Sequence, residues 1–324
     1  PAGMATRKIG PAVAAGCTMI LKPAGETPLT ALAIVDILER CGLPKGVLNV
    51  ILPAKTGPAI AKILHDSRVK NLSFTGSTQV GKLLLKEAAD QVIRCSMELG
   101  GNAPFVVLDD ANIEEAVKGL MMAKMRNGGA ACTAANRIYV ARSIGEKFIA
   151  EFAKAMAALK MGVGREAGIQ LGASVSMKER NKIAELVDAS KARGAKVHLG
   201  GATPDGAGAF YPATVLEVKK DDAILAEEVF GPVAPVVLFD TDEEALKLAN
   251  DTEYGLISYV YSEDLKRAIR FAEGLEAGMV GINRGLLSDP AAPFGGVKQS
   301  GLGREGGFDG VHEFLQTKYI GVEI

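Results

Sequence analysis

One cysteine stands in a run of unusually small residues. The segment RNGGAACTAANR, residues 126–137, contains two glycines, four alanines and Cys132, with an arginine at each end. The thiolate is the reactive form of cysteine, and it needs a path for its substrate and either a lowered pKa or a nearby base. Small neighbours leave such a path open. The segment therefore marks Cys132 as a candidate nucleophile, with a small core residue as the alternative.

A second candidate for chemistry is Glu98, in the apolar stretch CSMELGGNAPF, residues 95–105. Apolar neighbours should withdraw its carboxylate from water and raise its pKa, which suits a general base. Gly100 and Gly101 follow it and would let backbone or a ligand come close. The alternative is a glutamate that pairs with a basic residue at a domain boundary.

The segment GSTQVGKL, residues 76–83, has the glycine and lysine spacing of a Walker A loop. That loop needs a hydroxyl for magnesium after the lysine, and Leu83 has none, which argues against a P-loop nucleotidase. A strand, a glycine turn and a helix start can still bind a phosphate through backbone N–H groups and the helix dipole. Gly76, Ser77 and Gly81 would form that turn. A tight strand-to-helix connection without a ligand is the alternative.

Lys22 ends the short apolar run CTMILKP, residues 17–23. Open α/β sheets bind ligands at the carboxyl edge of their strands, so a lysine there could hold a nucleotide ribose or phosphate. A solvated lysine at a strand end is the alternative.

These side chains must be positioned by regular elements, and the hydrophobic pattern predicts alternating strands and helices. Expected strands in the first part are 17–23, 46–52 and 71–76, and expected helices are 28–41, 57–65 and 79–89. A second unit is expected from about Gly100, with strands at 103–110, 195–200, 233–239 and 258–262 and helices at 113–126, 177–193 and 243–250. This rhythm predicts an α/β fold with a parallel sheet covered on both faces. The closing stretch 318–324 alternates like a strand with nothing after it, so we expect it to pair with another subunit.

The composition limits the classes of partner. The 324 residues, 48% of them hydrophobic and 23% charged, suit a soluble globular protein of about two domains. Lys and Arg (37) balance Asp and Glu (38), so no bulk charge points to nucleic acid or to a membrane surface. No apolar run is long enough to span a bilayer and no signal peptide pattern is present, so a cytoplasmic location is expected.

The four cysteines are scattered without CxxC spacing, which argues against a zinc site or a disulfide framework and suits a reducing compartment. No metal is expected. Cys17, Cys41 and Cys95 are expected to be small, buried and inert. The chain begins at Pro1 in a segment that resembles the middle of a domain, so we expect a missing N-terminal part.

Six segments taken together resemble the aldehyde dehydrogenase family, and the resemblance runs over essentially the whole chain. They are LKPAGETP (21–28), FTGSTQVG (74–81), MELGGNAP (97–104), the Cys132 segment, EEVFGP (227–232) and PFGGVKQSGLGREG (293–306). Each would be weak alone, but six in order at suitable intervals are specific. The resemblance implies a Rossmann-like cofactor sheet plus an α/β catalytic domain, with boundaries at 1–99, 100–306 and 307–324, the last carrying the oligomerisation strand.

The resemblance also implies a role for each matched residue. Cys132 would attack the aldehyde to form a thiohemiacetal, its backbone N–H would help to bind the oxyanion, and Glu98 would activate the water that hydrolyses the thioester. The cofactor, NAD or NADP, would be bound by Lys22, Gly76, Ser77, Gly81, Glu228 and Phe230. Lys22 would reach the adenosine ribose and Glu228 the nicotinamide ribose.

Within the family the chain is most similar to succinate-semialdehyde dehydrogenases, notably in residues 5–24 and 278–289 and in Arg126. Their substrate carries a carboxylate opposite its aldehyde, and arginine suits a bidentate grip on a carboxylate. The resemblance makes Arg126, Arg7 and Ser288 the expected substrate-binding residues. A helix C-terminal cation is the alternative for Arg126.

Three departures from the family pattern affect the expected activity. Many members have a glutamine where this chain has Ala130. NAD-preferring members often have a glutamate at the position of Gly25, where Glu26 follows one step later. Without that anion NADP should be tolerated and becomes a candidate for the preferred cofactor. An oxyanion-binding asparagine of the family would precede Pro1, and loss of one such donor costs about a hundred- to a thousand-fold in rate.

The expected function is thus oxidation of succinate semialdehyde to succinate by a homodimer or homotetramer. The alternatives are an enzyme for another small aldehyde, a truncated fragment that only binds a cofactor or a partner, and the P-loop nucleotidase that Leu83 argues against.

Overall fold

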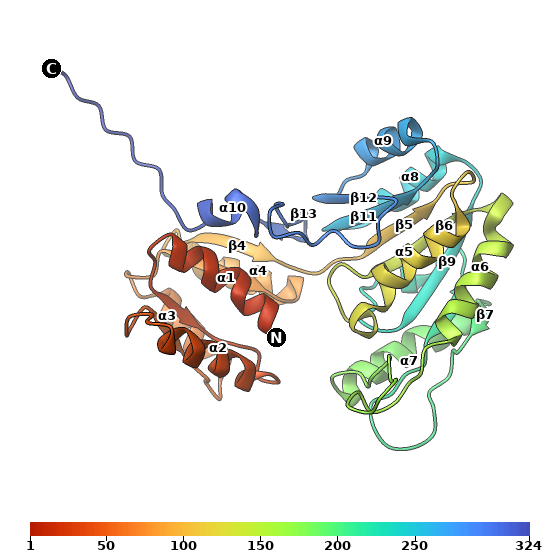
Figure 1. Ribbon diagram of the computed structural model, residues 1–324, viewed down its shortest axis with the longest axis horizontal. Coiled ribbons are helices and arrows are strands. Elements are labelled where there is room, and N and C mark those ends of the chain that lie inside the picture. Colours follow the sequence, from red (N-terminus) through yellow and green to blue (C-terminus); the bar gives the residue numbers. More distant parts are fainter. The chain divides into compact units, whose positions relative to one another are not determined.

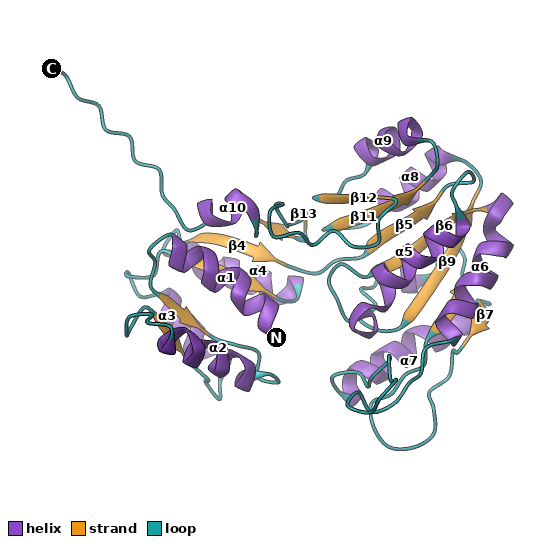
Figure 2. Ribbon diagram, in the orientation of Figure 1, coloured by secondary structure: helices purple, strands orange, loops and turns teal.

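The structure, a computed structural model, describes residues 1–324 and divides into two units. The first unit comprises Pro1–Leu99, Ser288–Gly295 and Gly301–Ile324, and the second comprises Gly100–Leu287 and Gly296–Ser300. The chain thus passes from one unit to the other directly after Leu99, so that Glu98 and Cys132 belong to different units. Figure 1 labels many of the elements along the chain, and Figure 2 separates helices from strands by colour.

The first unit is built from helices and two small sheets. Its helices are α1 (Ala2–Ala14), α2 (Pro28–Arg40), α3 (Thr56–Leu64), α4 (Thr78–Ala89) and α10 (Gly307–His312), and its strands are β1 (Met19–Leu21), β2 (Leu48–Val50), β3 (Asn71–Thr75), β4 (Arg94–Glu98) and β14 (Gly301–Leu302). β1 pairs in parallel with β2, and β3 pairs in parallel with β4, while β14 joins the other edge of β4 antiparallel. The predicted parallel pairing is therefore present, in two sheets.

Each of these sheets has its own apolar cluster. Ala5, Ile9, Leu21, Ala31 and Leu48 gather where α1 and α2 pack on the β1–β2 pair. Leu64, Ala88 and Ile93 form a second cluster beneath α3 and α4, with the partly buried Cys95 against it. The turn from β3 into α4 is closed by Ser77, whose hydroxyl accepts a hydrogen bond from the backbone N–H of Val80 at 3.4 Å.

The second unit is a seven-stranded sheet in the order β12-β11-β5-β6-β9-β8-β7. These strands are β5 (Ala103–Val107), β6 (Ala135–Ala141), β7 (Lys196–Leu199), β8 (Thr214–Glu217), β9 (Val233–Phe239), β11 (Ile257–Tyr261) and β12 (Met279–Ile282), and the short pair β10 (Tyr254–Gly255) and β13 (Val297–Lys298) stands apart. Every neighbouring pair in the sheet is parallel except β7 with β8. A parallel sheet needs both faces covered, and the buried patterns of β5, β6 and β11 meet that need.

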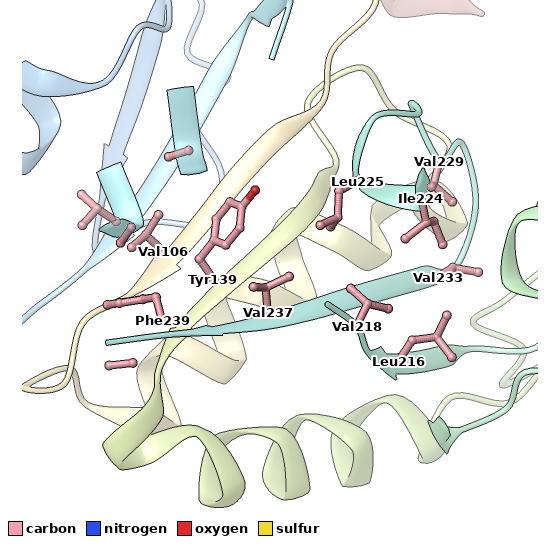
Figure 3. Close-up of a cluster of buried hydrophobic side chains, with 14 of the residues drawn as sticks. Val106, Tyr139, Leu216, Val218, Ile224, Leu225, Val229, Val233, Val237 and Phe239 are labelled. Atoms are coloured by element: carbon pink, nitrogen blue, oxygen red, sulfur yellow. The ribbon is translucent and has the colours of Figure 1, made fainter. Parts of the chain in front are cut away.

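Helices cover this sheet and enclose its core. They are α5 (Ile113–Met125), α6 (Arg142–Ala157), α7 (Met177–Ala192), α8 (Asp242–Asn250) and α9 (Leu265–Gly274). One large cluster joins inward side chains of β5, β6 and β9 to residues of α7, α8 and α9; Val106, Tyr139, Val237 and Phe239 are among those drawn in Figure 3. α5 and α6 pack on each other and on β6, burying Leu120, Phe148 and Phe152.

Two strands that position the site are absent from the sequence prediction. β4 follows a single turn after α4, and β6 carries the polar pair Asn136 and Arg137 inside an otherwise apolar strand. Arg137 is nonetheless buried, because its guanidinium donates to the backbone oxygens of Asn102, Leu248 and Ala249. Hydrogen-bond acceptors from distant parts of the chain thus stabilise a strand that the local hydrophobic pattern does not predict.

Two further expectations differ from the structure. Cys41 was expected to be buried but is exposed, because it follows the last residue of α2 as its C-cap. The segment 318–324 forms no strand within the chain: it runs on as an extended tail beyond α10, with Tyr319, Ile320 and Val322 largely exposed (Figure 1). No helix of the structure combines the length and apolar character needed to cross a bilayer.

Candidate active site

Glu98 is the last residue of β4 and lies under the surface of the first unit. Only 3% of the residue is exposed, and neither carboxylate oxygen has a hydrogen-bond partner. Its backbone oxygen accepts a hydrogen bond from the N–H of Gly76 at 3.0 Å, which fixes the strand end against the turn after β3. An unpartnered carboxylate in such a place is costly when ionised, which makes Glu98 a candidate for a chemical role.

The electrostatics around Glu98 agree with that interpretation. Burial, followed by the nearby negative charge of Glu305, raises the pKa of Glu98 to about 8. The positive charges of Lys8, Arg7 and Arg304 oppose this rise without cancelling it. Lys8 forms an ion pair with Glu305 at 2.5 Å, and Arg7 approaches the same carboxylate at 3.6 Å. A carboxyl with such a pKa can take up and release a proton near neutral pH.

The structure brings together two of the three expected substrate-binding residues. A terminal nitrogen of Arg7 donates to the hydroxyl of Ser288 at 3.3 Å, although 281 positions separate them. The same guanidinium lies 4.1 Å from the centroid of the Phe294 ring. Ser288 is exposed, and the side chain of Arg7 keeps 27% of its surface accessible. Arg7 is therefore held in place while part of it can reach a ligand.

The expected phosphate turn has the geometry of a strand–turn–helix connection. Gly76 follows β3, exposed Ser77 caps α4, and the helix then runs for 12 residues. Gly81 also matters for packing, because a Cβ there would overlap the side chain of Leu99. Gly81 therefore lets α4 pack closely, whereas Gly76 and Ser77 present the helix N-terminus. Lys22 directly follows β1, at the carboxyl end of the other parallel pair.

Cys132 lies in the second unit, in the loop between a 3-10 turn at Arg126–Gly129 and β6. The residue is half-buried and forms no disulfide. Gly101 packs against its backbone, and a Cβ at that position would overlap the carbonyl oxygen of Cys132. Asn127, in a left-handed conformation with φ 53°, donates to the backbone oxygen of Ala130 at 2.8 Å. The backbone of the loop is thus contacted at Ala130 and at Cys132 itself.

Arg126 is connected to this loop through Thr133. Its guanidinium donates to the hydroxyl of Thr133 at 3.0 Å, and the backbone oxygen of Thr133 accepts from the hydroxyl of Tyr259 at 2.8 Å. Burial raises the pKa of Tyr259, so the phenol remains a donor above the pH at which an ordinary tyrosine ionises. Arg126 itself is exposed. It therefore stays accessible to a ligand while it is hydrogen-bonded to the Cys132 loop.

Glu228 and Phe230, the other expected cofactor residues, stand in the segment before β9. A carboxylate oxygen of Glu228 accepts from the backbone N–H of Gly101 at 2.9 Å. Burial raises the pKa of Glu228, opposed by that hydrogen bond and by the charges of Lys182 and Lys124. The ring of Phe230 is 42% exposed. Gly101 therefore touches both the Cys132 loop and the Glu228 loop.

Five residues near these groups were not singled out from the sequence. They are Lys8, Glu305, Thr133, Tyr259 and Lys124. Glu305 lies within the matched segment 293–306 and could have been selected there; the others belong to no motif and gain their places through tertiary contacts. The structure contains no group of three or more His, Cys, Asp or Glu side chains arranged to hold a metal ion.

Comparison with known proteins places this geometry in a family. The chain matches the model of the aldehyde dehydrogenase family over residues 1–320. It is 53% identical over 323 residues to a succinate-semialdehyde dehydrogenase of Paenarthrobacter nicotinovorans, covering 99% of this chain and 72% of the relative. It is 46% identical over 324 residues to a glutarate-semialdehyde dehydrogenase of Pseudomonas putida, covering 100% and 67%.

Solved structures agree. The fold superimposes on an NADP dependent enzyme of E. coli with a TM-score of 0.97 at 43% identity, covering 99% of this chain and 66% of the other. The chain thus spans about two thirds of the length of the proteins it matches. Aldehyde dehydrogenases are oxidoreductases that use NAD or NADP. The family match along nearly all of its length, together with these relatives, shows that the chain belongs to the aldehyde dehydrogenase family.

Proposed function

We propose that the protein oxidises succinate semialdehyde to succinate with NADP or NAD. The observation that carries this proposal is Glu98, a buried carboxyl without a hydrogen-bond partner and with a pKa raised to about 8. Residues 1–99 would belong to the dinucleotide-binding domain, 100–306 to the catalytic domain and 307–324 to a segment for oligomerisation.

Cys132 would begin the reaction. Its thiolate attacks the aldehyde carbon, a C–S bond forms and the carbonyl oxygen becomes an oxyanion, toward which the backbone N–H of Cys132 would point. A bound NADP or NAD would supply the acceptor for the hydride that leaves the former aldehyde carbon. Cys132 then holds the acyl group as a thioester, with the same oxidation level as the acid product.

Glu98 would complete the reaction. Its ionised form takes a proton from water as the water oxygen attacks the thioester carbon, and the C–S bond then breaks to release succinate and the Cys132 thiolate. The absence of a hydrogen-bond partner for either oxygen supports this role, because a carboxylate committed to a structural partner would be a weaker base. Glu305, Lys8 and Arg7 would adjust the pKa at which Glu98 works.

The residues present suit a dinucleotide. The N-terminus of α4, opened by Gly76 and capped by exposed Ser77, offers backbone N–H groups and a positive dipole end to a pyrophosphate. Lys22 follows β1 and is accessible to a ribose or a phosphate. In the second unit Glu228 uses one carboxylate oxygen for Gly101, which leaves the other for a ribose hydroxyl. No acidic residue stands at position 25, so a 2′-phosphate near Lys22 meets no carboxylate there.

The arginines support a substrate with a distal carboxylate. Arg126 is bound to Thr133, directly after the nucleophile, and Arg7 is bound to Ser288. The relatives named above act, by their names, on succinate semialdehyde and glutarate semialdehyde, which both carry such a carboxylate and differ by one CH₂. Glutarate semialdehyde is therefore the second candidate substrate.

The test is the appearance of reduced cofactor with each aldehyde, using NADP and NAD separately. The protein is assayed as its gene encodes it, with Cys132→Ala as the control. We expect reduction that depends on Cys132 and that favours succinate semialdehyde over propionaldehyde by at least about tenfold in kcat/KM, since removing a paired charge costs over about 1.4 kcal/mol. Equal rates with propionaldehyde would refute the carboxylate site, and no reduction with any aldehyde would refute the proposed reaction.

We further propose a cytoplasmic homodimer or homotetramer in which the exposed segment 318–324 pairs with another subunit. Its alternating apolar side chains, largely exposed in the single chain, support this. Light scattering should give a mass above that of one chain, and deletion of 318–324 should reduce it to the monomer mass.

A further inference from the structure

Lys124 is the most deeply buried cationic side chain near the proposed site, and the reaction described above does not use it. It lies in the last turn of α5, two positions before Arg126, and its relative exposure is 0%. Its ammonium donates to the side-chain oxygen of Asn136 on β6 at 2.8 Å and to the backbone oxygen of Val229 at 3.5 Å. Both acceptors are neutral. A lysine is seldom buried so completely. Because burying its charge costs free energy, we expect this lysine to serve a function.

The acceptor Val229 stands between the two residues proposed to hold the nicotinamide end of the cofactor. Glu228 precedes it and Phe230 follows it. Two further hydrogen bonds hold the same segment. The N–H of Gly101 donates to the Glu228 carboxylate at 2.9 Å, and Nδ2 of Asn102 donates to the backbone oxygen of Leu225 at 2.7 Å. Lys124 is the one cationic donor among these hydrogen bonds, and it lies on the helix that leads to the Cys132 loop.

The charges of Lys124 and Glu228 are coupled. Burial lowers the pKa of Lys124 to about 7, and the negative charge of Glu228 opposes that fall. Burial raises the pKa of Glu228, and Lys124 opposes that rise together with Lys182, which is half exposed and paired with Glu227 at 3.4 Å. Each buried group therefore favours the charged form of the other.

We propose that Lys124 is a positioning residue for the cofactor: its ammonium holds the Val229 carbonyl and keeps Glu228 ionised. An ionised Glu228 accepts hydrogen bonds from ribose hydroxyls more strongly than a neutral one, and a fixed Val229 sets where the Glu228 and Phe230 side chains emerge. This inference rests on the proposed function, since it assumes that Glu228 contacts the nicotinamide ribose. A purely structural lysine that only satisfies Asn136 is the competing explanation.

A double-mutant cycle separates the two explanations. The variants are Lys124→Met, which keeps the length of the side chain and removes its charge, Glu228→Gln, and both together. The readout is the Kd for NADPH and for NADH from nucleotide fluorescence, which needs no turnover. We expect Lys124→Met to weaken binding at least about fivefold in the unaltered protein but less than about twofold in the Glu228→Gln background, because both actions of Lys124 serve mainly the Glu228 carboxylate, which is then gone. Equal weakening in both backgrounds would overturn the proposal.

Steady-state kinetics supply a second readout. Lys124→Met should raise the KM for the cofactor and leave the KM for the aldehyde within about twofold, as expected for lost cofactor binding alone. Equal changes in both KM values would indicate general distortion and contradict the proposal. Lys118→Met, on an exposed part of the same helix where Lys118 pairs with Glu114, is the matched control and should change neither constant.

Thermal unfolding of each variant establishes that it folds. If Lys124→Met does not fold, Lys124→Gln replaces it in the cycle, since glutamine keeps a donor for Asn136 while removing the charge. The failure of this inference differs from failure of the proposed function. An unaltered protein that binds neither NADPH nor NADH would refute the function, whereas tight binding that ignores Lys124→Met would refute only the role of Lys124.

Discussion

The guanidinium of Arg126 donates a hydrogen bond to the hydroxyl of Thr133 at 3.0 Å, and Thr133 directly follows the proposed nucleophile Cys132. The backbone of Thr133 is held in turn by Tyr259 at 2.8 Å. The exposed Arg126 is thereby linked to a loop whose backbone is held by Tyr259. This link connects the part of the site proposed to bind a carboxylate to the part proposed to form the C–S bond.

Thr133→Val should weaken recognition of the carboxylated aldehyde selectively. Valine has nearly the same shape but cannot accept from Arg126, and one such hydrogen bond to an exposed charge is worth about 1 kcal/mol, or about fivefold. We expect the KM for succinate semialdehyde to rise by that factor while kinetics with propionaldehyde stay unchanged. Thr133→Ser, which keeps the hydroxyl, is the control. Equal losses with both aldehydes would show that Thr133 serves the nucleophile loop instead.

The raised pKa of Glu98 predicts how activity depends on pH. The base must be ionised to act, so the rate of thioester hydrolysis should rise with pH and level off above about 8. Glu98→Gln should slow turnover by about 10²- to 10⁴-fold, yet still give a burst of reduced cofactor of about one equivalent per Cys132, because formation of the thioester does not use this base. A variant with no burst and no turnover would place Glu98 in the first half of the reaction.

The same pKa predicts how stability depends on pH. The folded protein holds the Glu98 proton up to about 8, whereas the unfolded chain releases it near the ordinary value of 4.5. The stabilising contribution is therefore complete below pH 4.5 and is lost as pH rises toward 8. Glu98→Gln, which cannot ionise, should raise the Tm at pH 8 relative to the unaltered protein and show a smaller difference at pH 5. A lower Tm at both pH values would mean that the carboxyl is partnered after all.

Gly25→Glu should shift the cofactor preference toward NAD. Position 25 is exposed and has no atom within 4 Å of an added Cβ, so the substitution should not disturb folding. A carboxylate near Lys22 would repel a 2′-phosphate by about 1–2 kcal/mol, which is roughly five- to thirtyfold in the ratio of NADP to NAD efficiency. Gly25→Gln, similar in size and uncharged, should leave the ratio almost unchanged. If glutamine shifts the ratio as much as glutamate, size rather than charge is responsible.

Gly101→Ala should disable the Cys132 loop. The added methyl group would overlap the backbone oxygen of Cys132, which cannot turn away as a flexible side chain could. Overpacking of this kind costs about 1–3 kcal/mol, and a shift of about 1 Å at a nucleophile can cost about a hundredfold in rate. We expect a lower Tm and a much larger fall in kcat. Gly172→Ala, where the added group meets open space, should change neither.

The amino-acid sequence alone predicted many of the helices and strands and the candidate residues for the chemistry. The helical spacing over 28–41 became α2, and the strand and glycine turn over 71–76 became β3 and the start of α4. These depend on contacts within a few positions, which a periodic pattern records. The local composition around Cys132 and Glu98 made them candidates, and the family resemblance of the matched segments added Glu228.

Only the tertiary structure decided the surroundings of those residues. Lys8 meets Glu305 across 297 positions, Arg7 meets Ser288 across 281, and Lys124 reaches Val229 across 105. β6 was hidden in the sequence because Asn136 and Arg137 are tolerated there only when Lys124 and distant carbonyl groups satisfy them. Burial and charge pairing depend on which segments fold against each other. Burial and nearby charges in turn determine the pKa of Glu98 and the environment of Lys124.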